Sequence, residues 1–450
     1  MKKILFVIAV LCMNAAIAQQ FQKCVTPDVI RQMNQAHPGY ADRVKAAFDN
    51  AKAASKNISA SRGVSDTVYR IRTVFHVVYT KPEENLDDSV ILAQLQTLNE
   101  DYRRLNADTT NTRSIFYPFA TDAGIEFELA DTDPDGNPTT GINRVVGTPA
   151  SSLFGGFGFN DEVKYASSGG VDAWDSERYF NIWVCNLLGG IGVLGYAYPP
   201  AVPLANWGAS NPNADSSKQG VVLHYSAVGP KNPAPIAPEA DGGRSATHEV
   251  GHYLGLRHIW GDDQGSNPFL PPSPKCFGDV DGGEDGIDDT PDATVASQQT
   301  CDTTVNTCPD PNLDQDYPDQ IENYMDYSDD ACLNMFTKGQ VDLMRTVIEL
   351  YRPGIATKVV NTPSGVKELS LSALQLRVFP NPANEVLNVV TSEVKENATL
   401  EVFNAQGTLV HAQKINGTSA KINLGSFSAG IYLTVVSADN FKSTARFIKK

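Results

Sequence analysis

Three histidines within eleven residues constrain this 450-residue chain more than any other feature. His248 and His252 are four residues apart in His-Glu-Val-Gly-His, a spacing that puts both imidazoles on one face of a helix, one turn apart. Gly255 tolerates the left-handed backbone that ends a helix, so the chain can turn and bring His258 to the same point. Three such side chains predict a zinc site whose fourth position stays open for water.

A glutamate directly follows the first of these histidines. Glu249 can reach a zinc-bound water, take its proton during attack on a carbonyl group, and pass the proton to the leaving amine. A bare His-Glu-x-x-His arises by chance in unrelated chains, whereas the extension to a third histidine is far more specific. We expect no functional role for the other four histidines: His76 and His224 in strand-like runs, and His37 and His411 at the surface.

The first 18 residues have the pattern of a secretory signal peptide. Two lysines precede ten apolar residues, Ile4 to Met13, and Ala16-Ile17-Ala18 offers small residues for cleavage. Ten apolar residues are too few to span a bilayer and no later stretch reaches the roughly 18 needed, so no transmembrane segment is expected. Export would take the chain to a compartment where disulfides persist.

The rest of the chain changes character three times. Residues 19–65 are polar and rich in Ala and Ser, with too few apolar residues for a core of their own, and are interpreted as a pro-segment with helices at 27–35 and 41–54. Residues 66–355 mix strands with helices, and a linker at 356–371 leads to short alternating runs at 372–450 that predict a small β-sandwich. Within 66–355 we expect strands at 68–80, 125–130, 179–185 and 221–225, and a helix at 88–105.

The chain is acidic, with a net charge of −16, which argues against nucleic acid as a partner. From Asp262 to Asp330 there are 18 Asp or Glu and one basic residue, Lys275. Such a stretch repels itself unless cations bind there, so it favours calcium, and a solvated acidic loop is the alternative.

At this point the sequence resembles the metzincin clan, and within it the pappalysin family. The extended histidine motif and Asn323-Tyr324-Met325-Asp326-Tyr327 carry the resemblance, which covers Tyr69 to Tyr351 and includes Tyr179 to Cys185 and Leu194-Gly195-Tyr196-Ala197. It implies an α+β zinc-protease domain with a mixed sheet and an active-site helix. It also implies a secreted zinc endopeptidase that acts on protein and peptide substrates and is made as a latent zymogen.

The resemblance assigns two residues beneath and beside the metal. Met325 would form the hydrophobic base under the histidines, and Tyr327 would donate a hydrogen bond to the oxyanion of the reacting carbonyl. Ordinary core packing for Met325 and a purely structural tyrosine at 327 are the alternatives.

Family members also carry two disulfides and calcium after the third histidine. The four cysteines here allow three connectivities, and the resemblance implies Cys276–Cys308 and Cys301–Cys332. It places calcium on the segment from Asp285 to Pro291. The ligands expected there are Asp285, Asp289 and Thr290, with Asp263 as a further one.

Two finer hypotheses concern regulation and specificity. Cys24 in the pro-segment could bind the zinc and displace its water, a role that competes with a Cys24–Cys185 disulfide or an idle thiol. Some pappalysins prefer Arg or Lys after the cut. Asp329 and Asp330, which follow the turn around Met325 (the methionine turn, residues 323–327), could supply the negative charge.

The last 79 residues, 372–450, resemble the C-terminal sorting domain of Bacteroidetes proteins exported by the type IX system. Val378-Phe379-Pro380-Asn381-Pro382-Ala383, Leu400 to Asn404 with Gly407, and Ser428-Ala429-Gly430-Ile431-Tyr432 carry this resemblance. It implies passage through the periplasm, contact with that secretion machinery, and release or attachment at the cell surface. A generic accessory sandwich is the alternative.

Two other functions compete with the endopeptidase. A surface adhesin with an inactive protease-like fold would not need the base, so the intact Glu249 argues against it. A zinc hydrolase of non-peptide substrates is compatible with the motif.

Overall fold

The chain divides into two compact units, Met1–Asn361 and Thr362–Lys450, which are described separately. The computed structural model describes residues 22–61, 67–147, 161–187, 193–203, 216–230, 232–262, 276, 285–297, 300–310, 313–360, 376–391, 398–404, 407–415, 417–438 and 441–450. The expected signal peptide, 1–18, lies outside them. No described helix combines the length and the apolar character needed to cross a membrane.

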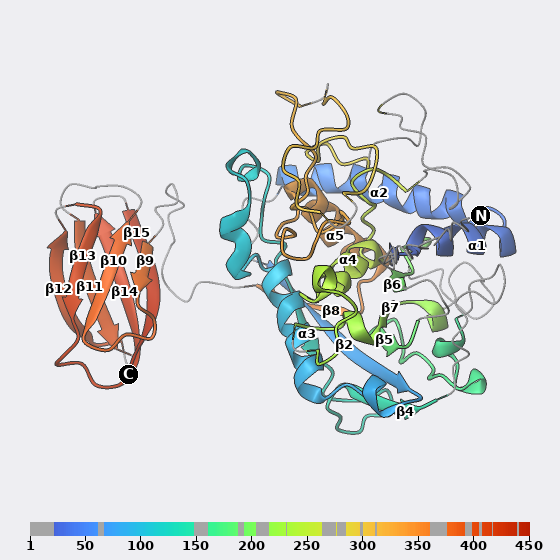
Figure 1. Ribbon diagram of the computed structural model, residues 1–450, viewed down its shortest axis with the longest axis horizontal. Coiled ribbons are helices and arrows are strands. Elements are labelled where there is room, and N and C mark those ends of the chain that lie inside the picture. Colours follow the sequence, from blue (N-terminus) through green and yellow to red (C-terminus); the bar gives the residue numbers. More distant parts are fainter. Residues whose placement is uncertain are drawn as a thin grey trace, which may run out of the picture. The chain divides into compact units, whose positions relative to one another are not determined.

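The first unit is built on a mixed sheet of eight described strands around the long strand β2 (Figure 1). The main path through this sheet is β1-β6-β7-β5-β2-β3, and β4 and β8 also pair with β2. All pairs are parallel except β6 with β7 and β2 with β8. The strands are β1 (Gln22–Cys24), β2 (Thr67–Tyr79), β3 (Ile125–Leu129), β4 (Ile142–Val146), β5 (Phe180–Cys185), β6 (Val193–Ala197), β7 (Val221–His224) and β8 (Ala356–Val360).

Five α-helices are described in this unit, and α4 lies at its centre. All ten residues of α4 are buried, and the helix packs against β6, β7 and α3, which brings its polar side chains to the edge of the sheet. The helices are α1 (Thr26–Ala36), α2 (Tyr40–Ser61), α3 (Asp88–Tyr102), α4 (Arg244–Tyr253) and α5 (Lys338–Tyr351).

The helices of residues 19–65, the range interpreted as a pro-segment, pack on the rest of the first unit, in line with a segment too polar to form its own core. Phe48 and Ala51 of α2 belong to the main hydrophobic core, and α2 lies along α5 (Figure 1). Val29 and Met33 of α1 join a second cluster with Trp183 of the sheet. Residues 22–24 extend the sheet as β1, parallel to β6.

The expected strands and the helix of the large domain all form, within a few residues of their expected ends. The range 356–371, interpreted as a linker, begins with β8, which pairs antiparallel with β2. The described parts of the Pro-, Gly- and Asp-rich stretch before residue 320 contain neither helix nor strand. Two disulfides hold this stretch, Cys276–Cys308 and Cys301–Cys332, which is the pairing that the resemblance implies.

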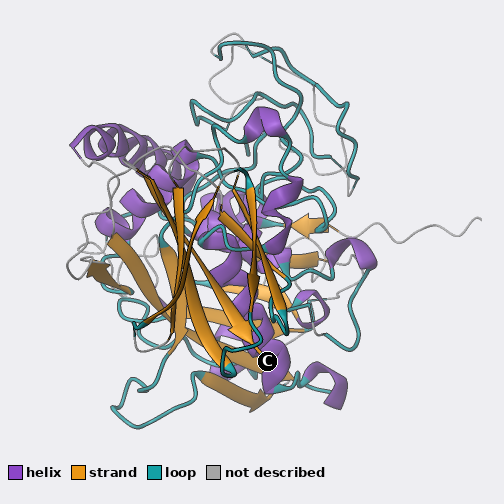
Figure 2. Ribbon diagram, turned by 90° about the vertical axis from the view of Figure 1, so that its left-hand side faces the viewer, coloured by secondary structure: helices purple, strands orange, loops and turns teal. Residues whose placement is uncertain are grey.

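The second unit consists of two antiparallel sheets, seen as orange strands in Figure 2. Leu387 and Val389 of the first sheet and Leu400 and Val402 of the second belong to one hydrophobic core, so the sheets form a small sandwich. The orders are β13-β10-β9 and β12-β11-β14-β15. The strands are β9 (Leu376–Phe379), β10 (Val386–Thr391), β11 (Ala398–Asn404), β12 (Leu409–Ile415), β13 (Ser419–Asn423), β14 (Gly430–Ala438) and β15 (Phe441–Lys449).

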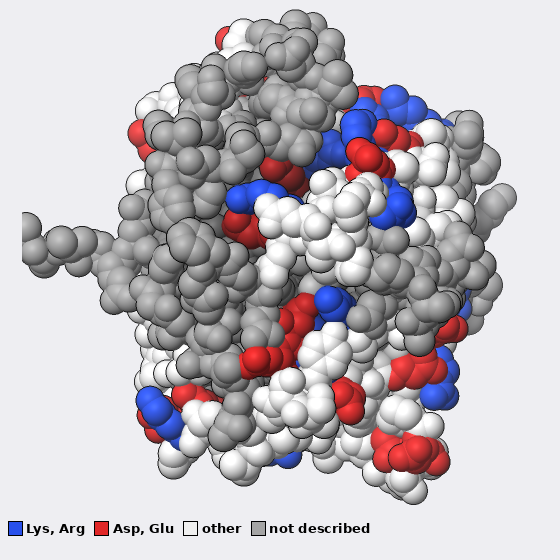
Figure 3. Space-filling model, turned by 90° about the vertical axis from the view of Figure 1, so that its right-hand side faces the viewer, with Lys and Arg blue, Asp and Glu red and all other residues white. Residues whose placement is uncertain are grey.

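The described surface on the side of α1 carries charges of both signs. Figure 3 shows acidic and basic side chains interspersed among uncharged ones on this face. The side chains of the three motif histidines and of Glu249, described next, are buried.

Candidate metal centre

The three histidines of the motif converge on one point. His248 and His252 project from α4, and the chain then turns at Gly255, whose φ is +94°. Leu256 N donates to Gly251 O at 2.9 Å, which closes the end of the helix and directs His258 back toward the other two rings. The three Nε2 atoms lie 3.2 Å from one another in all three pairs.

The second nitrogen of each ring fixes its tautomer. Because each Nδ1 donates a proton to an oxygen, each Nε2 presents a lone pair to the same point, and lone pairs this close repel unless a cation lies between them. An ion with tetrahedral bonds of roughly 2.0–2.1 Å needs nitrogens about 3.3 Å apart, so the cluster fits zinc. The acceptors are Tyr324 O for His248 (2.8 Å), Leu256 O for His252 (2.8 Å) and Asp262 Oδ1 for His258 (2.6 Å).

Burial keeps the rings of His248 and His252 neutral. It lowers the pKa of His252 to about 3, and it lowers the pKa of His248 well below its ordinary value. Neutral imidazole is the form that binds a metal, so no proton has to be removed near pH 7.

Glu249 is buried beside this cluster. Its Oε2 accepts hydrogen bonds from Thr26 Oγ1 at 3.0 Å and from Cys24 Sγ at 3.4 Å, and its Oε1 has no hydrogen-bond partner among the described residues. Burial raises its pKa to about 8. Gly195 of β6 makes room for it, since a β-carbon there would lie 2.8 Å from Glu249 Cγ. The carboxyl group is therefore held against β6 of the sheet.

Cys24 brings a sulfur atom to the histidines. Its Sγ and one nitrogen from each of the three rings all lie within 4.8 Å of one another. Cys24 and Cys185 are both buried and form no disulfide with each other. Burial and the charge of Glu249 raise the pKa of the Cys24 thiol well above its ordinary value, so a thiolate here requires a cation beside it.

The methionine turn lies directly under α4. Met325 is fully buried, and a β-carbon at Gly251 would collide with its sulfur, so the glycine inside the histidine motif allows the close approach. Tyr327 donates a hydrogen bond from its hydroxyl to Cys24 O at 3.1 Å, and its ring centroid is 5.0 Å from that of His258. Burial raises the pKa of Tyr327 well above its ordinary value, so the phenol keeps its proton and acts as a donor.

Sequence reasoning missed three residues that complete the site. Asp262 holds the Nδ1 of His258, and Trp260 stacks on the same ring with 4.5 Å between centroids and 10° between planes. Thr26 contacts Glu249. The spacing of Asp262 four residues after a ligand was a readable signal for an outer hydrogen-bond partner. The sequence holds no comparable signal for Thr26, which is 223 residues away from Glu249.

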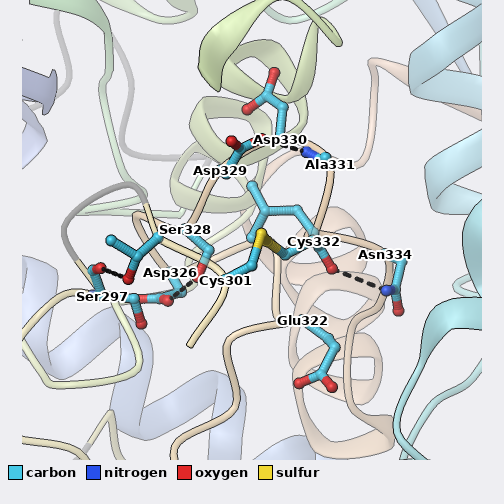
Figure 4. Close-up of a disulfide and its surroundings, with 12 residues drawn as sticks. Ser297, Cys301, Glu322, Asp326, Ser328, Asp329, Asp330, Ala331, Cys332 and Asn334 are labelled. Atoms are coloured by element: carbon cyan, nitrogen blue, oxygen red, sulfur yellow. Dashed lines mark hydrogen bonds between the residues drawn. A yellow bond between two sulfur atoms is a disulfide. The ribbon is translucent and has the colours of Figure 1, made fainter. Parts of the chain in front are cut away.

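The two acidic residues after the methionine turn differ in their surroundings (Figure 4). Asp329 is partly exposed, and its Oδ1 accepts the backbone amide of Ala331 at 2.8 Å, which closes a turn. Asp330 is buried and pairs with Lys23 of β1. The disulfide from Cys332 lies next to both of them (Figure 4).

The segment expected to bind calcium contains unsatisfied oxygen atoms. Asp289 Oδ1 and Thr290 Oγ1 are buried without a hydrogen-bond partner among the described residues. Asp285 is buried as well, and its Oδ1 accepts the backbone amide of Ile287 at 2.8 Å. Asp263 lies outside the described residues. Buried oxygens without partners suit a hard cation.

The fold and the histidine cluster are those of a secreted zinc metalloendopeptidase. Comparison with known proteins leads to the same class of enzyme. Residues 165–349 match the family described as pregnancy-associated plasma protein-A, and residues 377–450 match a secretion system C-terminal sorting domain. An extracellular metalloprotease of Arthroderma benhamiae is 28% identical over 333 residues, 74% of this chain and 87% of that protein.

Two solved structures from Tannerella forsythia resemble this chain more strongly. Mature mirolysin in complex with a cleaved peptide is 40% identical, with a TM-score of 0.51, over 62% of this chain and 92% of that one. A promirolysin mutant is 37% identical, with a TM-score of 0.58, over 73% and 94%. The chain belongs to the pappalysin family of metalloproteases. Its sorting domain makes it a secreted or cell-surface protein.

Proposed function

We propose that this chain hydrolyses peptide bonds with a zinc ion held by His248, His252 and His258. The convergence of three Nε2 lone pairs at 3.2 Å carries this proposal. A zinc ion bound there supplies a Lewis acid for the substrate carbonyl and lowers the pKa of a bound water. The same buried rings exclude bulk solvent from the metal's other side.

Glu249 is the general base and then the general acid. Its buried carboxyl group has a raised pKa, which suits a group that accepts a proton from water and returns it to the leaving amine near neutral pH. Tyr327 is the hydrogen-bond donor that stabilises the developing oxyanion, because its phenol remains protonated beside His258. Met325 supports the histidine rings from below.

The test is casein hydrolysis by the mature protein and its Glu249→Ala variant. We expect the variant to lose roughly 10²–10⁴-fold in rate while it keeps stoichiometric zinc, because the base is not a ligand. If the wild-type protein binds zinc but cleaves no protein, the result would instead support an inactive surface adhesin. If it cleaves small esters and no protein, the result would support a zinc hydrolase of non-peptide substrates. A Glu249→Ala variant as active as wild type would remove the proposed mechanism.

Residues 19–65 act as an inhibitory pro-segment in this proposal. Cys24 takes the position of the catalytic water, and Thr26 donates a hydrogen bond to the carboxylate of Glu249. A substrate would need both positions, so the precursor is latent until the pro-segment leaves. The likeness to a promirolysin structure, which retains its pro-form, supports this assignment.

Substrates carry a basic residue after the cut in this proposal. Asp330 is the acid that faces an ammonium group in the precursor, whereas Asp329 closes a turn. We assign the basic preference to Asp330.

A calcium ion stabilises the loop around Asp285, Asp289 and Thr290. The unsatisfied buried oxygens of Asp289 and Thr290 support this assignment, and burial raises the pKa of Asp289 as long as no cation is bound. The sandwich at 372–450 carries the chain through the periplasm to the type IX machinery.

A further inference from the structure

Asp101, near the end of α3, is a fully buried carboxylate that the proposed mechanism does not use. Its Oδ1 accepts the hydroxyl of Tyr324 at 2.9 Å, and its Oδ2 accepts the hydroxyl of Thr247 at 2.7 Å. Arg244 supplies the opposite charge, with its Nε 3.1 Å from Asp101 Oδ2. One side chain of α3 therefore joins α4 to the methionine turn.

Both hydroxyl groups belong to residues that orient the zinc ligand His248. Thr247 precedes His248 on α4, so the hydrogen bond to its side chain restrains the helical turn that carries the ring. Tyr324 offers its backbone oxygen to His248 Nδ1 at 2.8 Å, while its side chain is held by Asp101. A shift of Thr247 or of Tyr324 would therefore move the nitrogen that faces the metal.

A second contact from α3 reaches the same turn of α4. Tyr102, the residue after Asp101, donates a hydrogen bond from its hydroxyl to the backbone oxygen of Thr247 at 3.0 Å. α3 thus holds Thr247 by its side chain and by its backbone. The helix that carries two of the three histidines is fixed against α3 at the residue before the first of them.

Arg244 is the first residue of α4, so its ion pair with Asp101 also fixes the start of the helix. Its Nη1 lies 3.0 Å from Asp108 Oδ2 and donates to the backbone oxygen of Asp330 at 2.9 Å. The cation that balances the charge of Asp101 is therefore itself held in place by two other segments.

Stability alone does not explain a buried charge at this place. Moving a carboxylate out of water costs several kcal/mol, and a buried ion pair is often no more stable than apolar side chains of similar size. What Asp101 adds is direction, because each of its two oxygens accepts one hydroxyl. The hydroxyls come from the two segments that orient His248, so the contacts favour a role in the geometry of the metal centre.

We infer that Asp101 is a positioning residue for the zinc ligand His248: through the hydroxyls of Thr247 and Tyr324 it fixes the helical turn and the backbone oxygen that orient the imidazole. This inference rests on the proposed function, because it concerns the zinc ion proposed there. Asp101 is not one of the groups that converge on the metal position. Loss of its contacts should therefore weaken zinc binding while the fold remains.

The test compares single hydroxyl deletions in the full-length chain. Tyr324→Phe keeps the ring and Thr247→Val keeps the shape of the side chain, and each removes one bond to Asp101. The control is Tyr69→Phe, which removes a tyrosine–carboxylate bond to Glu349 elsewhere in the same hydrophobic core. We expect Tyr324→Phe and Thr247→Val to weaken zinc affinity about tenfold, measured by competition with a chelator, and Tyr69→Phe to bind zinc as wild type does.

The melting temperature of the zinc-free chains separates positioning from stability. Tyr324→Phe and Tyr69→Phe each lose one buried hydrogen bond, so both melting temperatures should fall by roughly a few degrees. Only Tyr324→Phe should lose zinc affinity as well. In an Asp101→Leu background, where the acceptor is already absent, Tyr324→Phe should change zinc affinity by less than about twofold.

The inference is overturned if Tyr324→Phe and Thr247→Val bind zinc as tightly as wild type, or if Tyr69→Phe loses as much zinc affinity as they do. It is also overturned if Tyr324→Phe costs the same affinity with and without the carboxylate of Asp101. A wild-type chain that binds no zinc would remove the proposed function too. Wild type that holds zinc and cleaves casein, beside variants with unchanged zinc affinity, removes only this inference.

Discussion

Cys24 places a sulfur atom where a catalytic zinc ion would hold water, since it lies within 4.8 Å of the three histidine nitrogens. Thiolate binds zinc well and would be displaced only when the pro-segment moves away. At the scale of single residues, we propose that Cys24 closes the open position of the metal.

The prediction at this scale concerns the Cys24→Ala precursor. We expect it to show casein-cleaving activity before removal of the pro-segment, at a level below that of the mature enzyme, because Lys23 and Thr26 still occupy the site. Activity of the purified precursor is the measurement, and Cys185→Ala, which removes the other buried thiol, is the control. A Cys24→Ala precursor as latent as wild type would rule out the thiol as the blocking group.

Sequence patterns predict residues of the site that act through local spacing. His248, Glu249 and His252 sit on one helical turn, so their proximity follows from the geometry of the helix. Contacts between distant segments, such as Thr26 with Glu249 or Lys23 with Asp330, depend on the pairing of β1 with β6. That pairing leaves no mark in a three-residue strand, so the sequence did not predict it.

At the scale of elements, long periodic segments were predicted and short paired ones were missed. β2 can be predicted from the sequence, because its 13 residues are rich in β-branched and aromatic side chains. β4 has no buried residue and pairs only with β2, and β8 lies in a range interpreted as a linker. These two segments form strands because they pair with the backbone of β2, and this tertiary contact is not visible in their own sequences.

The strands β2, β4 and β5 meet at a buried histidine. His76 Nε2 bonds to Asn181 Oδ1 at 2.9 Å, and its Nδ1 bonds to Asn143 Nδ2 at 3.3 Å, which fits a neutral ring. Burial lowers the pKa of His76 to about 4. Protonation of this ring therefore opposes the folded state.

We predict that this histidine makes the first unit sensitive to acid. Its folded pKa is below the unfolded value near 6.5, so its contribution is complete above that pH and is lost as the pH falls toward 4, by about 2 kcal/mol at pH 5. The measurement is the unfolding free energy of wild type and His76→Gln between pH 7 and pH 5. The variant should lose less stability over this range. Parallel curves for the two proteins would contradict the assignment.

At the scale of the whole molecule, a long stretch without regular structure has to be held in place. Within the described residues, two disulfides and the unsatisfied oxygens of Asp289 and Thr290 lie in this stretch. The sequence predicted that cations bind in this stretch, because its acidic side chains otherwise repel one another.

We predict that calcium supplies part of this restraint. A chelator selective for calcium over zinc should lower the melting temperature of the mature protein, and added calcium should restore it, because an ion that binds only the folded state stabilises it. Differential scanning fluorimetry with zinc content monitored in parallel is the measurement. An unchanged melting temperature after complete removal of calcium would show that the acidic loop needs no cation.

The zinc site itself is tested most directly by metal analysis and X-ray absorption spectroscopy of the purified protein. We predict one zinc ion per chain, bound in the mature enzyme by three imidazole nitrogens at about 2.0–2.1 Å and one oxygen, and in the precursor with a sulfur at about 2.3 Å in place of that oxygen. Substoichiometric zinc in the active protein, or zinc bound without three imidazoles, would contradict the proposed metal centre.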